Sequence, residues 1–264
     1  MKTVAQRRQR RFAKIRKPMN LNDPHAAIDW QDLVVFDVDG TFYDQRRLRL
    51  AMLAQLLRHS LQTRSLHTLR VLRTFRKVRE ALGDAAALLP AGAEPEDFML
   101  AQYARTAQRH GLTPQAVQQL AEDWLEQRPL PSLAACRYPQ LDALFDALHE
   151  QGKQVAVFSD YPAAAKLHAL KFKAWPISCA TDPAIGRLKP DPRGLLEVLR
   201  QSGVPARRAL MIGDRFDRDA EAARRAGVRA LIRSAKSHPA FATFEHYDDA
   251  VFKPLLTSGA AVLA

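Results

Sequence analysis

Cysteine is scarce in this sequence, and the two cysteines that occur are far apart. Cys136 and Cys179 belong to no Cys-x-x-Cys pair and have no neighbouring pair of histidines. This spacing argues against a disulfide framework and against a structural zinc site of the usual kinds. Because so few thiols are typical of a chain that folds in a reducing compartment, we expect a cytoplasmic protein.

Long apolar runs are also missing. No stretch approaches the roughly 18 apolar residues of a membrane-spanning helix, and the first residues lack the apolar segment and cleavage pattern of a secretory signal. The sequence contains no Walker glycine loop, no Gly-x-Ser-x-Gly elbow and no Cys–His pairing. We therefore expect a protein that neither crosses a membrane nor is exported.

Positive charge is in excess and is concentrated in two segments. The 264 residues include 40 Lys and Arg against 28 Asp and Glu, a formal net charge of +12. Residues 1–30 carry eight basic residues against two acidic ones, and residues 44–82 carry ten against two. We interpret residues 1–28 as a flexible basic arm, for which weak contact with an anionic membrane stays open. Since Phe75 is the only aromatic residue among the charges of 44–82, we expect no nucleic acid partner.

The remaining composition is that of an ordinary globular protein, with 47% hydrophobic and 26% charged residues. Short apolar runs alternate with helical patterns, several of which end at a glycine such as Gly152, Gly203 or Gly227. Alternation of this kind is typical of a parallel sheet with helical crossovers, an α/β fold. The expected strands, the last two on weaker signals, are 33–36, 155–158, 209–212, 177–180 and 228–232.

Residues 45–135 interrupt this alternation with one helical pattern after another. They include the apolar spacing of Leu53, Leu56 and Leu57, and a Thr113-Pro114 pair that is typical of a helix start. Such a segment is far longer than an ordinary crossover between neighbouring strands. We therefore predict a helical cap domain at 45–135, inserted into a catalytic core made of residues 29–44 and 136–264.

Acidic and hydroxyl side chains directly follow several of the predicted strands, and a basic one, Lys189, stands nine residues beyond the strand at 177–180. In an open parallel sheet this edge is where ligands bind. Because alternate residues of an extended segment share a face, Asp37 and Asp39 are able to approach one centre, and Gly40 allows a sharp turn beside it. The polar segments are Asp37-Val38-Asp39-Gly40-Thr41, Ser159-Asp160, Lys189 and Gly213-Asp214 with Asp219 five residues later.

Several carboxylates that converge on one point repel one another unless a cation lies between them. Mg²⁺ is the expected cation because it prefers oxygen ligands and is commonly completed by substrate phosphate. A nearby ammonium and hydroxyl would hold the remaining oxygens of a phosphoryl group. The residue set therefore predicts a site for phosphoryl transfer.

The order and spacing of these segments resemble the haloacid dehalogenase superfamily, in its phosphatase branch with a helical cap. The resemblance spans about residues 30–233 and rests on Asp37-Val38-Asp39-Gly40-Thr41, Ser159, Lys189 and Asp214 with Asp219. It implies that Asp37 is the nucleophile that forms an aspartyl-phosphate. Asp39 would be the acid that protonates the leaving oxygen and then the base that activates water.

The same resemblance implies a Mg²⁺ site and a phosphate site. Mg²⁺ would be held by the side chains of Asp37 and Asp214 and by the backbone carbonyl of Asp39. Phosphate would be held by Thr41, Ser159 and Lys189, with Asp219 in a supporting role. One departure concerns this site directly, since Asp160 stands where asparagine is frequent and adds a negative charge. Two other departures do not affect the expected chemistry: Gln45 stands where serine is common in the family, and Phe42 stands where leucine is usual.

We therefore predict a Rossmann-like α/β core with an inserted helical cap that acts as a Mg²⁺-dependent phosphohydrolase on a small organic phosphate monoester. Two alternatives stay open: a phosphomutase of the same superfamily, and a non-catalytic docking protein that uses the basic arm and cap. A dehalogenase is disfavoured because a halide needs no acid such as Asp39 when it leaves. The sequence leaves the identity of the phosphoester and the oligomeric state undetermined.

Overall fold

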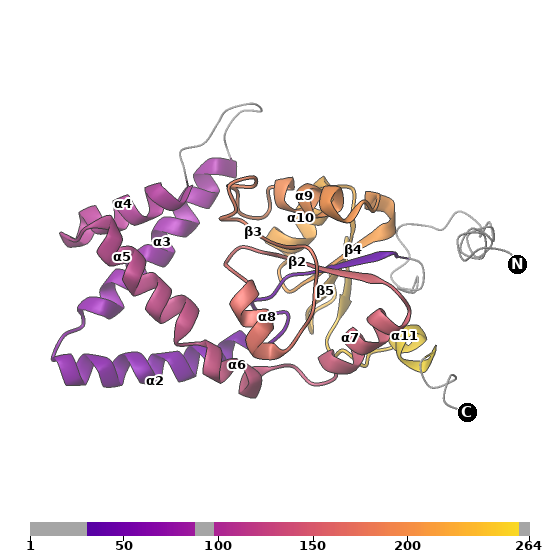
Figure 1. Ribbon diagram of the computed structural model, residues 1–264, viewed down its shortest axis with the longest axis horizontal. Helices are drawn as coiled ribbons and strands as arrows, with labels where there is room; N and C mark the ends of the chain where they lie inside the picture. The colour runs from indigo at the N-terminus through magenta and orange to yellow at the C-terminus, as the bar shows by residue number, and fades with distance from the viewer. Residues whose placement is uncertain (1–30, 88–97, 259–264) are drawn as a thin grey trace, which may run out of the picture.

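The described part of the chain, residues 31–87 and 98–258 of a computed structural model, folds around one parallel sheet with a separate group of helices beside it (Figure 1). The predicted basic arm, 1–28, lies outside these residues. Six strands form the sheet in the order β3-β2-β1-β4-β5-β6, and every neighbouring pair is parallel. The strands are β1 (Leu33–Phe36), β2 (Gln154–Ser159), β3 (Ile177–Cys179), β4 (Ala209–Gly213), β5 (Arg229–Arg233) and β6 (Ala242–Phe244).

The α/β fold class and the five expected strands are confirmed, and one strand was missed. β6 is only three residues long, Ala-Thr-Phe, and pairs with β5 at the edge of the sheet. Three residues are too few for a dependable pattern, and β3, which is equally short, was itself expected only on a weaker signal. Its place in the sheet depends on pairing with β5, which is a tertiary contact.

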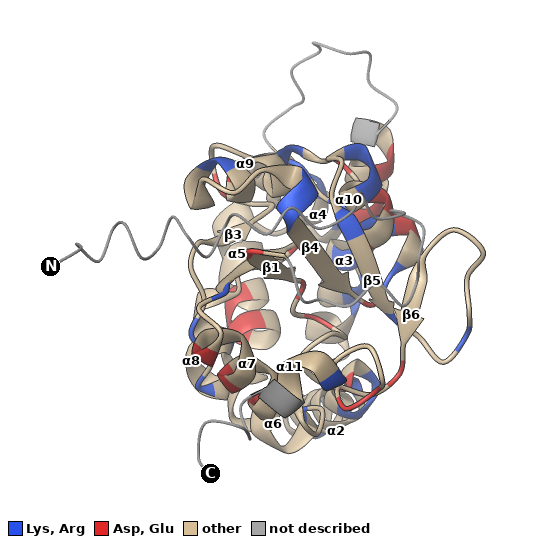
Figure 2. Ribbon diagram, turned by 90° about the vertical axis from the view of Figure 1, so that its right-hand side faces the viewer, with Lys and Arg blue, Asp and Glu red and all other residues tan. Residues whose placement is uncertain are grey.

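The two faces of the sheet are covered by different helices, and the side chains of β1 alternate between them. Val34 and Phe36 pack into one core cluster, while Leu33 and Val35 pack into the other. All four are fully buried, which explains why β1 is an unbroken apolar run. The helices on the first face are α7 (Leu141–Glu150), α8 (Ala164–Leu170) and α11 (Lys253–Ser258), and those on the second are α9 (Arg193–Ser202) and α10 (Glu221–Arg225) (Figures 1 and 2). Short helical turns, η3 (Ala206–Arg208) and η4 (Phe216–Ala220), flank β4.

A helical region follows β1 and precedes β2. Its chain enters and leaves by adjacent segments, because the Asp44 amide donates to the Cys136 carbonyl at 2.9 Å and the Tyr138 amide donates to the Phe42 carbonyl at 3.0 Å. The exact domain boundaries stay a prediction. The helices are α2 (Gln45–Thr63), α3 (His67–Ala87), α4 (Phe98–His110), α5 (Pro114–Ala121), the π-helical turn η2 (Glu122–Gln127) and α6 (Leu130–Cys136).

Side-chain caps begin two of these helices. The Asp44 carboxylate accepts hydrogen bonds from the first amides of α2, and the Thr113 hydroxyl accepts one from the Ala116 amide at 3.2 Å. The start predicted at Thr113-Pro114 is therefore confirmed. α8 was not expected, since it has only seven residues and does not begin with a side-chain cap. α6 is equally short but falls in the segment 45–135 that was predicted to be helical.

The apolar stripe of α2, which its leucine spacing would place in a core, is mostly not buried. Among its residues only Leu48 and Ser60 are buried, while Leu53 and Leu57 are 43% and 48% exposed. The small core of the helical region is made instead by α3, α4 and α5 around Phe75. Several leucines of α2 are therefore not used to hold the fold together.

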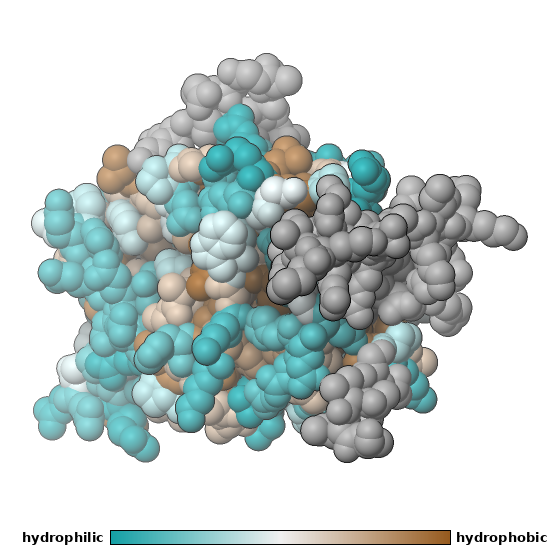
Figure 3. Space-filling model, turned by 45° about the vertical axis from the view of Figure 1, so that its right-hand side comes forward, coloured by the Kyte–Doolittle hydropathy of each residue, from teal (hydrophilic) through white to brown (hydrophobic). Residues whose placement is uncertain are grey.

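The surface of the described residues is largely hydrophilic on the face that Figure 3 presents. Across residues 31–87 and 98–258, no helix combines the length and the apolarity that a bilayer crossing requires.

Gly194 allows α9 to pack closely against β2, and this contact gives a test of the fold. A Cβ atom at Gly194 would lie 2.1 Å from the ring of Phe158, which is fully buried. We expect Gly194→Ala to lower the free energy of unfolding by about 1–3 kcal/mol because the core is overpacked. Urea denaturation measures the loss. Arg193→Ala, an exposed change on the same helix, should stay within about 0.5 kcal/mol, and equal effects of the two variants would contradict the packing.

Candidate active site

Acidic side chains from two neighbouring strands meet at the carboxyl edge of the sheet. Asp37 follows β1, Asp214 follows β4, and these strands are paired from Leu33↔Ala209 to Phe36↔Ile212. Oxygen atoms of Asp37, Asp214 and Asp219 all lie within 4.8 Å of one another. The convergence predicted from the strand ends is therefore present in the fold.

Two glycines permit this close approach. Gly40 has a positive φ of +96°, and a Cβ atom there would lie 2.1 Å from Asp214 Oδ2. Gly213 ends β4, and a Cβ atom on it would lie 2.4 Å from Asp219 Cγ. At both positions a side chain would occupy the space that a carboxylate fills.

Lys189 lies between two of these carboxylates. Its Nζ is 2.6 Å from Asp37 Oδ1 and 2.6 Å from Asp219 Oδ1, and all three side chains are buried. Burial alone lowers the pKa of Lys189, but the charges of Asp219 and Asp37 outweigh it and raise the pKa well above its usual value. Lys189 is therefore an ammonium ion that offsets part of the negative charge.

The single positive charge of Lys189 does not neutralise the three carboxyl groups of the cluster. Burial raises the pKa of Asp37 well above its usual value, and the charges of Asp219 and Asp214 add to this while Lys189 opposes it. Burial and the charge of Asp219 raise the pKa of Asp214 to about 7. Both carboxyls therefore hold their protons more tightly than usual, as expected where a further cation is needed.

The donor set fits a small hard cation such as Mg²⁺. Carboxylate oxygens are the ligands that such a cation prefers. In the described part of the chain no group donates a hydrogen bond to the Asp214 carboxylate, which leaves both of its oxygens available. Asp219 is more occupied, because its Oδ2 accepts from the backbone amides of Asp214 and Arg215 at 3.1 and 3.0 Å.

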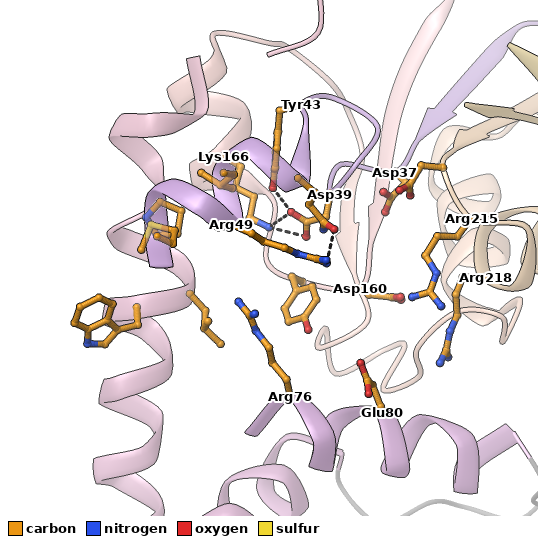
Figure 4. A pocket seen from close by; sticks show the side chains of 18 of the residues that line it. Asp37, Asp39, Tyr43, Arg49, Arg76, Glu80, Asp160, Lys166, Arg215 and Arg218 are labelled. Atoms are coloured by element: carbon orange, nitrogen blue, oxygen red, sulfur yellow. Dashed lines mark hydrogen bonds and ion pairs between the residues drawn. The ribbon is translucent and has the colours of Figure 1, made fainter. Parts of the chain in front are cut away.

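Asp39 lies beside this cluster and is held by partners of its own (Figure 4). Lys166 Nζ is 2.7 and 2.8 Å from its two carboxylate oxygens, and the Tyr43 hydroxyl donates a hydrogen bond to Oδ1. Burial raises the pKa of Asp39, but the charge and hydrogen bonds of Lys166 and the hydrogen bond of Tyr43 outweigh it, so that the pKa is lowered. Asp39 is thus an ionised carboxylate in this arrangement.

Lys166 and Tyr43 were missed by reasoning from the sequence. Lys166 belongs to α8, a helix without a recognisable start, and Tyr43 falls two residues after Thr41 in no chemical pattern. Only the packing of α8 beside the turn after β1 brings the ammonium to Asp39. No spacing in the sequence carries this information.

The three residues predicted to bind phosphate differ in their hydrogen bonds and in their access to the cavity. The Thr41 hydroxyl donates to Asp37 Oδ2 at 3.3 Å, and Lys189 contacts Asp37 directly. Ser159 is buried, and its hydroxyl accepts a hydrogen bond from the Tyr161 amide at 3.2 Å. Of these three residues, only Lys189 lines the cavity beside the carboxylates.

Asp160 also has a structural contact. Its Oδ1 accepts a hydrogen bond from the Lys189 amide at 2.9 Å and so holds the segment that carries the ammonium. The Asp160 carbonyl accepts a hydrogen bond from Arg79 of α3, whose guanidinium lies 4.1 Å from the centre of the Tyr161 ring. A second link joins Arg218 to Asp84 of α3 at 3.4 Å. The C-terminal half of α3 therefore rests on the carboxyl edge of the sheet.

A cavity of about 700 Å³ lies between the sheet edge and the helical region. Its core side presents Asp37, Asp39, Lys189 and Asp214. The opposite side is formed by α2, α3 and η2, from which Arg49 and Arg76 reach the cavity (Figure 4). The carboxylate cluster is thus open to a ligand that approaches under the helices.

Comparison with known proteins agrees with this geometry. The family model described as haloacid dehalogenase-like hydrolase matches residues 31–227. The chain is 30% identical over 204 residues to a phosphoglycolate phosphatase of Rhodospirillum rubrum, an alignment that covers 76% of this chain and 78% of that protein.

Two solved structures share the fold. A 2-haloacid dehalogenase from Pseudomonas syringae superposes with a TM-score of 0.60 at 22% identity, over 87% of this chain and 99% of that chain. A HAD-hydrolase from Bacillus subtilis superposes with a TM-score of 0.57 at 16% identity, over 85% and 98% of the two chains. The family match and the sequence relative together show that this chain belongs to the haloacid dehalogenase-like hydrolases, as a member with a helical cap.

Proposed function

We propose that the protein is a Mg²⁺-dependent phosphohydrolase that cleaves an organic phosphate monoester through an aspartyl-phosphate on Asp37. The observation that carries this proposal is the cluster of Asp37, Asp214 and Asp219 around the Lys189 ammonium at the open edge of the sheet. A relative named phosphoglycolate phosphatase supports hydrolysis of a phosphate ester.

The side chains of Asp37 and Asp214 and the backbone carbonyl of Asp39 would hold Mg²⁺. The ion would offset the negative charge that the phosphate brings to these carboxylates. The Bacillus subtilis hydrolase of the same fold was crystallised bound to magnesium. Asp219 is better suited to position Lys189, because both of its oxygens already accept hydrogen bonds.

Asp37 would act as the nucleophile. One of its carboxylate oxygens attacks phosphorus, and the bond from phosphorus to the alcohol oxygen breaks. A water molecule then attacks the phosphorus of the aspartyl-phosphate, which releases inorganic phosphate and regenerates the Asp37 carboxylate. Splitting one displacement into two steps lets one positioned acid–base group serve both.

Asp39 would be that acid–base group. As an ionised carboxylate it is ready to take the proton of the attacking water. For the first step it must carry a proton to the leaving alcohol oxygen. Asp39 regains that proton from the attacking water in the second step, and Lys166 Nζ, within 2.8 Å of both of its oxygens, holds the carboxyl group in position.

Lys189, Thr41 and Ser159 would bind the phosphate oxygens. Lys189 already faces the cavity, and Thr41 lies against the nucleophile. Ser159 stands at the end of β2, next to the central strand β1. A hydroxyl and an ammonium close to phosphorus stabilise the charge that develops in phosphoryl transfer.

The alternatives are less well supported by the residues at hand. A dehalogenase has no need of the acid–base group that Asp39 provides, and the Pseudomonas syringae dehalogenase is similar in fold alone. A phosphomutase requires a second hydroxyl-bearing substrate to take the phosphoryl group from Asp37. Measuring phosphate release against isomerisation of a sugar phosphate separates a hydrolase from a mutase, and release without isomerisation supports the proposal.

Removal of the nucleophile tests the proposed chemistry. We expect Asp37→Asn to lower the rate of phosphate release from p-nitrophenyl phosphate by at least about a thousandfold, because an amide does not form the aspartyl-phosphate. The matched control is Asp217→Asn, since the Asp217 side chain is 66% exposed and pairs with Arg215. Wild-type activity in Asp37→Asn would refute the covalent scheme.

Metal affinity should depend on pH through Asp214. Its pKa of about 7 means that below this pH a bound proton must be displaced before the carboxylate ligates Mg²⁺. We expect apparent Mg²⁺ affinity, measured by calorimetry between pH 5.5 and 8.5, to fall by up to about tenfold per pH unit below 7. Asp214→Asn should remove most of the binding. Affinity that is unchanged across this range would argue against Asp214 as a ligand.

The role of Lys166 is open to a separate test. Lys166→Met removes the charge that lowers the Asp39 pKa and leaves the effect of burial, so this pKa should rise. The acidic limb of the activity profile should then move to higher pH, because Asp39 must be ionised to accept a proton from water. With p-nitrophenyl phosphate, whose leaving group needs no proton, kcat against pH reports this base step. Lys173→Met, an exposed change, is the control, and identical profiles for the two variants would contradict the role.

A further inference from the structure

The cavity above the carboxylates is much larger than a phosphoryl group requires. Its volume of about 700 Å³ falls in the range of about 300–1,000 Å³ that is typical of pockets for whole drug-sized ligands. Most of its outer wall comes from the helical region, so the part of a substrate that is not phosphate would lie against α2, α3 and η2.

This outer wall changes from charged to apolar along α2. The helix starts at the catalytic edge, where Asp44 is its cap, and its early cavity residues are Gln45, Arg49 and Leu48, the last of which is buried and packs into the core. Further along, the cavity residues are Met52, Leu53 and Leu56. With a rise of about 1.5 Å per residue, Leu56 lies roughly 18 Å along the helix axis from Asp44.

The helix α3 shows the same order in the opposite chain direction. Its C-terminal half contacts the core through Arg79 and Asp84. Its cavity residues closest in sequence to this contact are Arg76 and Glu80, whereas Leu69 lines the cavity from the first turn of the helix. Both helices therefore carry their charged cavity residues near the carboxylates, and their leucines that pack into no core lie further away.

These leucines have no structural role that explains their position. Leu53, Leu56 and Leu69 belong to none of the hydrophobic core clusters among the described residues. Leu53 remains 43% exposed although it lines the cavity. Apolar side chains that face a cavity and pack into no core are typical of a surface that binds an apolar ligand group.

We infer that the substrate is the phosphate monoester of an amphiphilic alcohol with an extended apolar chain. This inference rests on the proposed phosphohydrolase function and names the substrate class of the same site. The phosphate would lie at Asp37 and Lys189, and the apolar chain would run past Arg49 toward Leu56 and Leu69. A two-carbon acid such as phosphoglycolate has no apolar part for this wall.

A series of n-alkyl phosphates from ethyl to octyl tests the inference with the full-length protein and Mg²⁺. The alcohols in this series differ little in leaving-group basicity, so kcat/KM reports recognition of the chain. We expect kcat/KM to rise about two- to fourfold per added methylene group as apolar surface is buried. Octyl phosphate should exceed ethyl phosphate by at least about fiftyfold and should also exceed phosphoglycolate.

Neighbouring leucines of α2 provide a matched pair of variants. Leu56→Gln changes a cavity residue, while Leu57→Gln places the same polar group on an exposed residue outside the cavity wall. We expect Leu56→Gln to lower kcat/KM for octyl phosphate about tenfold and to leave ethyl phosphate within twofold, whereas Leu57→Gln keeps the wild-type profile. Leu69→Gln, on α3, repeats the test should the first variant not fold. Equal losses for both chain lengths would overturn the inference.

Binding of n-alkyl phosphonates, which are not hydrolysed, distinguishes failure of the proposed phosphohydrolase function from failure of the proposed substrate class. Hydrolysis of p-nitrophenyl phosphate together with a flat chain-length profile would overturn the substrate class and keep the phosphohydrolase. Tighter calorimetric binding of octylphosphonate than of ethylphosphonate, without hydrolysis of any ester, would overturn the phosphohydrolase and support the ligand class. Absence of both would overturn both.

Discussion

The active edge of this protein depends on the burial of negative charge around one ammonium ion. Lys189 lies 2.6 Å from Asp37 and 2.6 Å from Asp219, and these buried groups are completed by Asp214. Carboxylates at this spacing raise one another's pKa, so a proton or a cation among them relieves their repulsion. The single ammonium leaves negative charge that a further cation would offset.

The backbone is arranged to permit this concentration of charge. Pairing of β1 with β4 places Asp37 and Asp214 on adjacent strand ends, and Gly40 leaves room for the Asp214 carboxylate. Asp160 holds the Lys189 segment by its amide. The same edge carries α3 through Arg79, so a helix of the outer wall of the cavity rests on the segment next to the carboxylate cluster.

The helical region uses its apolar residues in two different ways. Around Phe75 they form a small core that joins α3, α4 and α5. Along α2 they line the cavity or stay exposed, as Leu56 and Leu57 do. The periodic spacing of leucine in the sequence indicates a helix in both cases. It does not distinguish a face that stabilises the fold from a face that meets a ligand, because both need the same side chains.

The sequence alone determined the parallel α/β core, the helical insertion and the meeting of Asp37, Asp214, Asp219 and Lys189. Apolar runs specify buried strands, and parallel strands end at a common edge, so local pattern is sufficient for the core and for the approach of Asp37 and Asp214, whereas Lys189 and Asp219 followed from the resemblance to a known family. Only the tertiary structure decided that Lys166 and Tyr43 hold Asp39 and that Leu56 faces the cavity. The Lys166 contact joins elements far apart in the chain through the packing of α8, and although Tyr43 lies only four residues from Asp39, no local pattern marks it as a partner.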